Sequence, residues 1–152
     1  YNMKSLYELK LGSYTNRKKI SELLDINLTG WSAVGINRVD DKVLLWVNLD
    51  KDVSQAQYND GFLDNKSIFQ WESQTKQTEE SKDIQAIINK EVEVHLFCRI
   101  SNVGPHTYMG KLKHMRHESS EPVKIFFKSI DFDPSIKLCA EIINHSPSRN
   151  RL

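Results

Sequence analysis

The sequence predicts an α+β domain with a curved, mostly antiparallel sheet or a partly closed barrel and about three helices. Segments with period-two alternation dominate and are joined by short polar connections, which is typical of antiparallel strands. Three other segments have helical spacing and lie near the start, the middle and the end of the chain. With 152 residues, 39% of them hydrophobic, the chain is long enough to bury one core. We therefore expect residues 1–152 to form a single domain.

The first helix is expected over residues 15–25, with Ser13 or Thr15 as its N-cap. Apolar residues recur on one face of it at Ile20, Leu23 and Leu24. Basic residues are expected on its opposite face near the start, at Arg17, Lys18 and Lys19. Because positive charge there opposes the helix dipole, these residues suggest a role beyond helix stability.

Two strands follow over residues 31–38 and 42–49, joined by a polar connection typical of a hairpin. In the second strand Leu44 and Trp46 alternate with another apolar set, so both of its faces should be covered. The long polar segment 50–65 is expected to be a functional loop. Residues 67–74 read as a strand.

A second helix should begin at Ser81, with an apolar stripe one turn later. Strands are expected over residues 92–100, 107–115 and 123–130. Asp133-Pro134 has the form of a helix start and predicts a third helix. The tail 146–152 is expected to fray.

No arrangement of residues identifies a catalytic centre, and we expect neither a metal nor a cofactor. The sequence lacks G-x-S-x-G and the glycine-rich phosphate loops. His114 and His117 are three apart on a predicted strand, so they should face opposite sides, as should His95 and Cys98. A small metal-dependent nuclease remains an alternative, because Gln74-Thr75-Lys76 follows Asp60 or Asp64 in a loosely fitting pattern.

The cellular setting is expected to be the cytoplasm, without membrane attachment. The two cysteines lie in apolar contexts that predict buried free thiols, which suit a reducing compartment. The longest apolar runs are too short to span a bilayer, and no signal-type sequence opens the chain. Because the chain begins at Tyr1 rather than Met, we expect a piece of a longer multidomain protein.

Aromatic side chains are frequent on the predicted strands and in the long loop, and most must serve the core. Residues 69–74 are unusual because they mix two large rings with amides and a hydroxyl. Such a mixture suits a pocket that stacks a planar group and reads its edge by hydrogen bonds. A polar edge strand beside a packed Trp71 is the alternative interpretation.

Net charge is only +1, so any contact with nucleic acid must depend on local clusters of basic residues. A solvated surface is the ordinary interpretation of such residues, and contact with a phosphate backbone is the functional one. The candidates for backbone contact are Arg17, Lys18, Lys19, Lys76, Arg99, Lys111, Lys113 and Arg116.

A spaced series of motifs carries a resemblance to a known family. The motifs are Tyr58-Asn59-Asp60-Gly61-Phe62, Phe69-Gln70-Trp71-Glu72-Ser73-Gln74, Val94-His95-Leu96-Phe97-Cys98-Arg99, Tyr108-Met109-Gly110-Lys111 and Pro122-Val123-Lys124-Ile125-Phe126. Together they resemble an uncharacterised domain at the C-terminal end of bacterial superfamily-two helicases and in some restriction-type nucleases. The resemblance implies a DNA-recognition accessory of a restriction or defence enzyme, and a fold similar to the PUA and SRA-like group. Some members of that group flip a modified base into an aromatic-lined pocket.

On this chain the resemblance implies that Asp60 accepts from a cytosine amine and that Trp71 or Tyr58 stacks on the base. The full candidate set for the base pocket is Tyr58, Asp60, Phe62, Trp71, Ser73, Gln74 and Trp31. The expected partners are double-stranded DNA, with or without a modified base, and helicase or nuclease domains of the same polypeptide, which would supply any activity. The alternative to DNA recognition is a protein-interaction or scaffolding domain whose segment 58–71 docks a partner.

Overall fold

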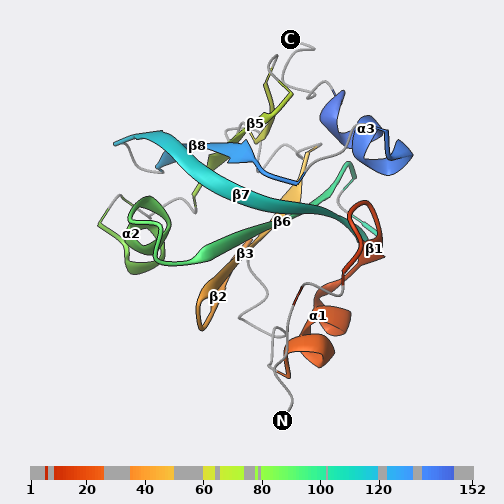
Figure 1. Ribbon diagram of the computed structural model, residues 1–152, viewed down its shortest axis with the longest axis horizontal. Coiled ribbons are helices and arrows are strands. Elements are labelled where there is room, and N and C mark those ends of the chain that lie inside the picture. The colour runs from red at the N-terminus through yellow and green to blue at the C-terminus, as the bar shows by residue number, and fades with distance from the viewer. Residues whose placement is uncertain are drawn as a thin grey trace.

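Figure 1 shows the computed structural model, whose elements follow the predicted order of helices and strands. The structure describes residues 6, 9–25, 35–49, 60–63, 66–73, 78, 80–101, 103–119, 123–131 and 135–145. Several predicted features therefore lie outside the described residues: Trp31, Tyr58, Gln74, Lys76, Asp133-Pro134 and the tail 146–152.

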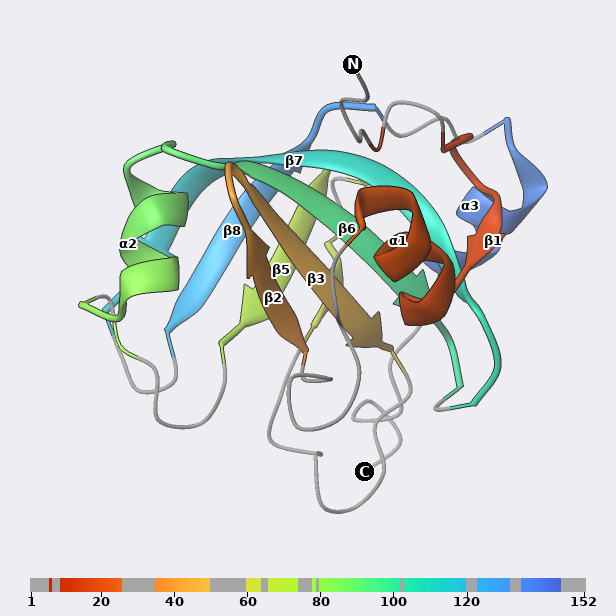
Figure 2. The same cartoon turned by 90° about the horizontal axis from the view of Figure 1, so that it is seen from below.

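The described strands form one curved sheet with the order β2-β3-β6-β7-β8-β5-β4, and β1 pairs with β7 at one side. The strands are β1 (Tyr14–Thr15), β2 (Ile36–Val39), β3 (Lys42–Asn48), β4 (Gly61–Phe62), β5 (Ile68–Glu72), β6 (Glu93–Arg99), β7 (His106–Glu118) and β8 (Lys124–Ser129). Figure 2 shows the sheet wrapping around itself, with β5 and β8 behind β2 and β3. The predicted α+β fold with a curved sheet is thus confirmed, and the sheet does not close into a complete barrel.

The sheet is mixed, because β3 and β6 run parallel while the other pairs are antiparallel. A parallel pair needs a long connection between its strands. Here that connection contains β4, β5 and the helix α2 (Lys82–Ile88). Both faces of β3 are covered, which explains why Val43–Val47 is a continuous buried apolar run.

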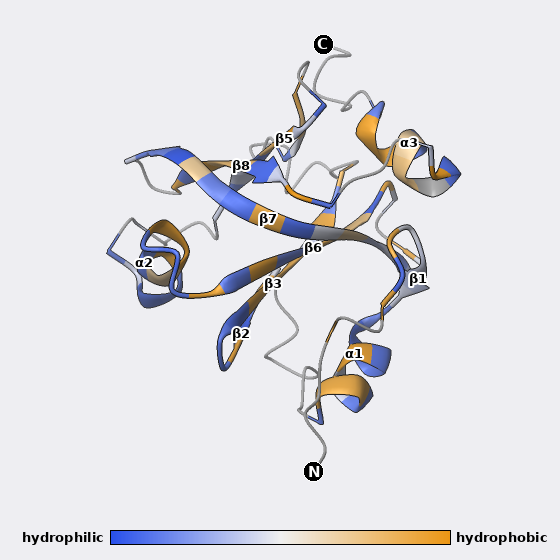
Figure 3. Cartoon of the chain, viewed as in Figure 1, coloured by the Kyte–Doolittle hydropathy of each residue, from blue (hydrophilic) through white to orange (hydrophobic). Residues whose placement is uncertain are grey.

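Two hydrophobic clusters lie on opposite faces of the sheet. The inner core holds one face of β3, β5, β6, β7 and β8 together with Ile84 and Ile87 of α2 and Ile142 of α3 (Lys137–Ile143). The outer core lies under α1 (Arg17–Leu24) and includes Ile20, Leu24, Leu44, Trp46, Phe97 and Tyr108. Figure 3 shows apolar residues on all three helices among polar ones. Burying each such large apolar side chain contributes roughly 1.5–3 kcal/mol, so the alternation on β3 and β6 stabilises both layers.

The helix starts differ from the prediction. The N-cap of α1 is Asn16, whose side-chain oxygen accepts from the Lys19 backbone N–H at 2.9 Å. Thr15 cannot serve as the cap because it is paired in β1. The third helix begins at Lys137 rather than at Asp133, since the preceding Ile136 is extended with ψ 120° and packs against the inner core.

Candidate functional site

The first part of the site is a polar corner where β4 begins and β5 ends. Here Asp60, buried with 6% of its surface exposed, accepts a hydrogen bond from the Glu72 backbone N–H at 2.8 Å. Ser73 and Val123 are joined by two bonds of 2.9 Å: the Ser73 N–H donates to the Val123 carbonyl, and the Val123 N–H donates to the Ser73 hydroxyl. We call Asp60, Glu72, Ser73 and Val123 the β5 corner.

The aromatic candidates beside this corner point inward. Trp71 is 3% exposed and belongs to the inner core, with its ring centroid 6.4 Å from that of Phe127. Phe62 is half-buried, and its ring meets Phe69 edge-on at 5.0 Å. Of the predicted base pocket, the structure therefore places Asp60 and Ser73 at the β5 corner. Trp71, two residues before Ser73, is buried in the inner core.

The second part is a row of cations on the outer face of β7 and β8. Strand register places Lys113 opposite Lys128, and Arg116 opposite Phe126, with its guanidinium carbon 3.7 Å from the ring centroid. Lys113, Arg116 and Lys128 are exposed. Their neighbours along the same face are Lys111 on β7 and Lys124 on β8. We call Lys111, Lys113, Arg116, Lys124 and Lys128 the basic strip.

Among the described residues, acidic side chains form ion pairs with the strip at Arg116 and Lys124. Arg116 lies 3.9 Å from Glu118, and Lys124 lies 3.9 Å from Glu72 and 4.0 Å from Glu118. The Arg116–Glu118 pair is exposed, and pairs of this kind contribute little to stability. The Lys124–Glu72 pair is partly buried, with 28% and 11% of the two side chains exposed. Because Glu72 also belongs to the β5 corner, Lys124 links the corner to the strip.

A bulge in β7 decides which side chains share a face. The register of β7 against β8 shifts between His114 and Arg116, which leaves Met115 as the extra residue. Without this residue, Arg116 would face the opposite side from Lys111 and Lys113. The bulge also brings His114 and His117 to one face.

The prediction that these two histidines face opposite sides is therefore wrong. The His114 Nε2 and His117 Nδ1 atoms are 3.1 Å apart. Burial, then the charges of His117 and Lys90, lower the pKa of His114. Within the described part of the chain, no group of three or more His, Cys, Asp or Glu side chains could hold a metal ion.

The cations at the start of α1 do not share one face. Lys18 and Lys19 are exposed as expected, but the guanidinium of Arg17 lies 4.8 Å from the Trp46 ring centroid, against the sheet. Arg99 at the end of β6 donates from Nε to Asn48 Oδ1 at 2.7 Å and from Nη1 to the Gly104 carbonyl at 2.5 Å. Burial lowers the pKa of both arginines, and the charge of Arg99 lowers that of Arg17 further. Arg17 on α1 and Arg99 at the end of β6 therefore act on each other and do not form part of the basic strip.

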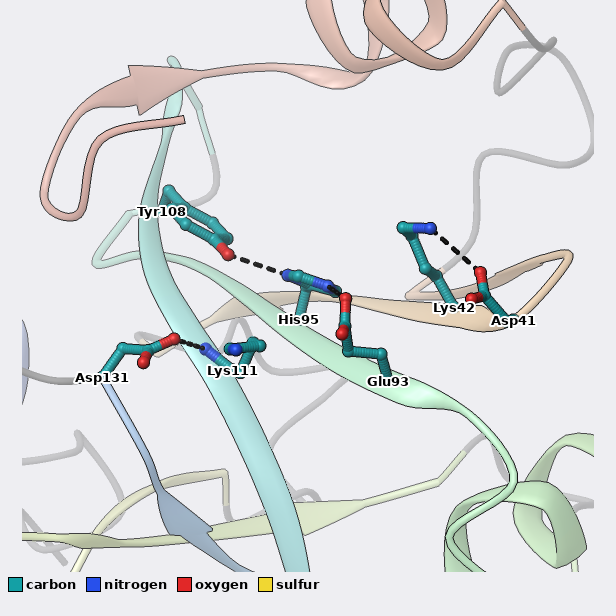
Figure 4. Close-up of polar contacts among 7 residues, drawn as sticks. All are labelled: Asp41, Lys42, Glu93, His95, Tyr108, Lys111 and Asp131. Carbon is teal, nitrogen blue, oxygen red and sulfur yellow. Dashed lines mark hydrogen bonds and ion pairs between the residues drawn. The ribbon is translucent and has the colours of Figure 1, made fainter. Parts of the chain in front are cut away.

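A buried histidine anchors the face beside the strip (Figure 4). The two ring nitrogens of His95 lie 2.8 Å from the Tyr108 hydroxyl and 2.7 Å from Glu93 Oε1. Burial lowers the pKa of His95, although Glu93 acts in the opposite direction. His95 is paired across the sheet with Lys111, whose backbone N–H donates to Asp131 Oδ2 at 3.0 Å. As predicted, His95 and Cys98 lie on opposite faces, with Cys98 in the inner core.

Sequence reasoning missed Lys124 and Lys128. Their alternation within residues 123–130 indicated one face of a strand, but only the pairing of β8 with β7 joins them to Lys113 and Arg116. Among the described helices, none has the length and apolar character needed to cross a membrane.

Comparison with known proteins gives a family match and a structural likeness. A family model described as a domain of unknown function, DUF3427, matches residues 9–133. The SRA domain of SUVH5 in complex with hemimethylated CG DNA superposes with a TM-score of 0.57 and 18% identity, covering 88% of this chain and 97% of that one. SUVH6 of Arabidopsis thaliana gives 0.57 at 13% identity, covering 92% of this chain and 30% of that one.

The SUVH5 SRA domain bound to fully hydroxymethylated CG DNA gives a TM-score of 0.54 at 18% identity, covering 88% of this chain and 97% of that one. No curated protein sequence matches the chain. The predicted PUA/SRA-like fold is confirmed by these likenesses.

Proposed function

The chain belongs to the DUF3427 family, and from that premise we propose that it is a DNA-recognition domain that reads a modified cytosine in double-stranded DNA. The observation that carries this proposal is the basic strip, in which Lys113 and Lys128 face each other across two strands. Like charges directly opposite one another destabilise a strand pair. A phosphate backbone lying along β7 and β8 would offset this repulsion and explain why both cations are present.

The SRA-like fold supports the same ligand. Similar structures are complexes of an SRA domain with hemimethylated, fully methylated and hydroxymethylated CG DNA. With a net charge of +1 on the whole chain, the concentration of five cations on one face is a local feature rather than a consequence of composition. Such a patch steers an anionic polymer to the sheet.

Recognition of the base is assigned to the β5 corner. The Asp60 carboxylate is oriented by the Glu72 N–H, and a carboxylate is a suitable acceptor for the exocyclic amine of cytosine. Ser73 and Gln74 would complete the hydrogen bonding, and Tyr58 would stack on an extruded base. Trp71 and Phe62 would form the apolar wall behind it, since both pack against the inner core.

Within a longer polypeptide, this domain would direct a helicase or nuclease of a restriction or defence enzyme to modified DNA. The domain supplies recognition, and the partner domains supply the reaction. This assignment rests on the resemblance of its motifs to domains of such enzymes.

The test is binding of the chain to duplexes of one sequence that contain cytosine, 5-methylcytosine or 5-hydroxymethylcytosine at one position. We expect salt-dependent binding to all three and tighter binding to a modified one. Asp60→Asn should remove the preference among duplexes while leaving the salt dependence unchanged. Absence of binding to every duplex at low salt would refute the proposal, and equal binding to the three would refute its modified-base part.

A further inference from the structure

A cavity of about 310 Å³ opens beside the end of β6, apart from the β5 corner and the basic strip. Its volume lies at the lower end of the range of small-ligand sites. Residues of β1, the β6–β7 connection and α3 line it, among them Tyr14, Arg99, Ser101, Val103, Glu141 and Ile142. We propose that this cavity binds a single nucleotide whose base carries an exocyclic amine, with the phosphate at Arg99 and the base between Tyr14 and α3.

Arg99 provides the anion-binding end. It donates from Nε to Asn48 Oδ1 and from Nη1 to the Gly104 carbonyl, both neutral oxygens, and these two bonds fix the plane of the guanidinium. None of the ion pairs among the described residues involves Arg99. The remaining N–H groups of a guanidinium held in this way can donate to two oxygens of one phosphate.

The positive field at this end of the sheet is stronger than one arginine would produce. Arg17 is close enough to Arg99 for the two charges to oppose each other, and both charges also act on the buried His106. An anion beside Arg99 would compensate for this like-charge repulsion and for the burial of the guanidinium. The arrangement therefore favours a phosphate at this point.

The walls of the cavity suit a planar ring. Tyr14 is 56% exposed and Val103 is 71% exposed, although both are large and apolar. The backbone of Tyr14 pairs with Thr107 in the sheet, so the side chain projects from a fixed position beside the cavity. An exposed aromatic ring on a paired strand is the kind of platform on which a base stacks.

Glu141 on α3 lines the same cavity and supplies an acceptor. A carboxylate accepts from an exocyclic amine, which cytosine and adenine carry and thymine lacks. It would also repel a second phosphate, so the cavity should prefer a monophosphate to a more highly charged nucleotide. The cation, the ring platform and the carboxylate together define the ligand class.

The ligand could be a free nucleotide or one nucleotide of a DNA strand, and both present the same chemistry. Titrations should compare deoxycytidine monophosphate with deoxycytidine, thymidine monophosphate and inorganic phosphate, using two-dimensional NMR of the whole chain. We expect deoxycytidine monophosphate to bind about tenfold tighter than the nucleoside or the phosphate alone. A titration with a single-stranded trinucleotide that has cytosine at its centre distinguishes the two sources. If the trinucleotide binds more tightly than the monophosphate, the cavity takes a nucleotide of a strand. If it binds more weakly, the cavity takes a free nucleotide.

Three variants test the three contacts. Tyr14→Ser should weaken binding by about tenfold through loss of stacking. Glu141→Gln should abolish the preference over thymidine monophosphate, and Arg99→Gln should remove the advantage of the monophosphate over the nucleoside. Tyr14 and Glu141 are exposed, so those two variants report on binding even if Arg99→Gln unfolds.

Two results would overturn the assignment. One is equal binding of the nucleoside and its monophosphate to the unchanged chain, and the other is binding that none of the three variants alters. The cavity does not depend on the basic strip, so Lys113→Glu with Lys128→Glu should leave the nucleotide titration unchanged. Failure of duplex binding and failure of nucleotide binding are therefore separate outcomes.

Discussion

His106 should make the stability of this domain sensitive to mild acid. It lies at the start of β7 with 4% of its surface exposed, and the Trp46 ring meets it edge-on at 5.2 Å. Burial, then the charge of Arg99 and that of Arg17, lower the pKa of His106 from 6.5 to about 3. The folded chain therefore keeps this imidazole neutral at a pH where the unfolded chain protonates it.

The size of the effect follows from proton linkage. Between pH 6.5 and about 3 the unfolded state binds the additional proton, so the free energy of unfolding decreases as the pH falls. The stabilisation is complete above the unfolded pKa and is lost progressively below it. At pH 5 the loss from this one group is about 2 kcal/mol relative to pH 8, since each pH unit corresponds to about 1.4 kcal/mol.

The measurement is urea denaturation of the chain at pH 8, 7, 6 and 5, with NMR of the imidazole to report its protonation directly. His106→Gln should remove about 2 kcal/mol of the difference between pH 8 and pH 5. Arg17→Gln should raise the pKa of His106, whereas the neighbouring Lys18→Gln serves as a charge-matched control and should not. An imidazole of His106 that protonates above pH 5 in the folded chain would refute the reasoning.

Three further outcomes are expected. Lys113→Glu with Lys128→Glu should reduce the slope of log K against log salt for duplex binding by about 1.8, at about 0.9 for each lost phosphate contact. Lys10→Glu with Lys137→Glu is the matched control. A slope that the first pair leaves unchanged would contradict DNA contact by the basic strip. Ser73→Ala removes the acceptor of the buried Val123 N–H and should cost about 1–3 kcal/mol in urea denaturation, with Ser13→Ala expected to change much less. Gly110→Ala should lower the free energy of unfolding by roughly 1–3 kcal/mol, because Gly110 has φ +90° and an added Cβ would lie 2.7 Å from Asp131 Cβ. A thermal midpoint equal to that of the unchanged chain would show that the backbone relaxes.

Local patterns were sufficient for most elements. The alternation over β6 placed Val94 and Cys98 in one core and His95 on the other face, and the stripe of α1 placed Ile20 and Leu24 against the sheet. These assignments succeed because the helix and strand periods depend only on neighbours in the sequence. The helix starts failed where a neighbouring element intervened: Thr15 is used by β1, and Ile136 is held extended against the inner core.

The candidate site depended more on long-range contacts. Asp60 and Ser73 were predicted to share a site; in the fold Asp60 bonds to the N–H of Glu72, the residue before Ser73, and their role toward a base stays a proposal. Arg17 was expected on the solvent face of α1 but lies over Trp46, because the packing angle of a helix is not encoded in its own residues. Two cations of the strip, Lys124 and Lys128, became visible only through their partners on β7.

By itself, the sequence determined the α+β class, the three helices, most of the strands and the apolar face of each, because these follow from composition and short-range period. Tertiary structure alone decided the parallel pairing of β3 with β6 and the position of the β7 bulge. That bulge moves Arg116 onto the face of Lys113 and brings His114 to His117. Strand register and bulges are set by pairing between segments far apart in the sequence, and one extra residue reverses every side chain that follows it.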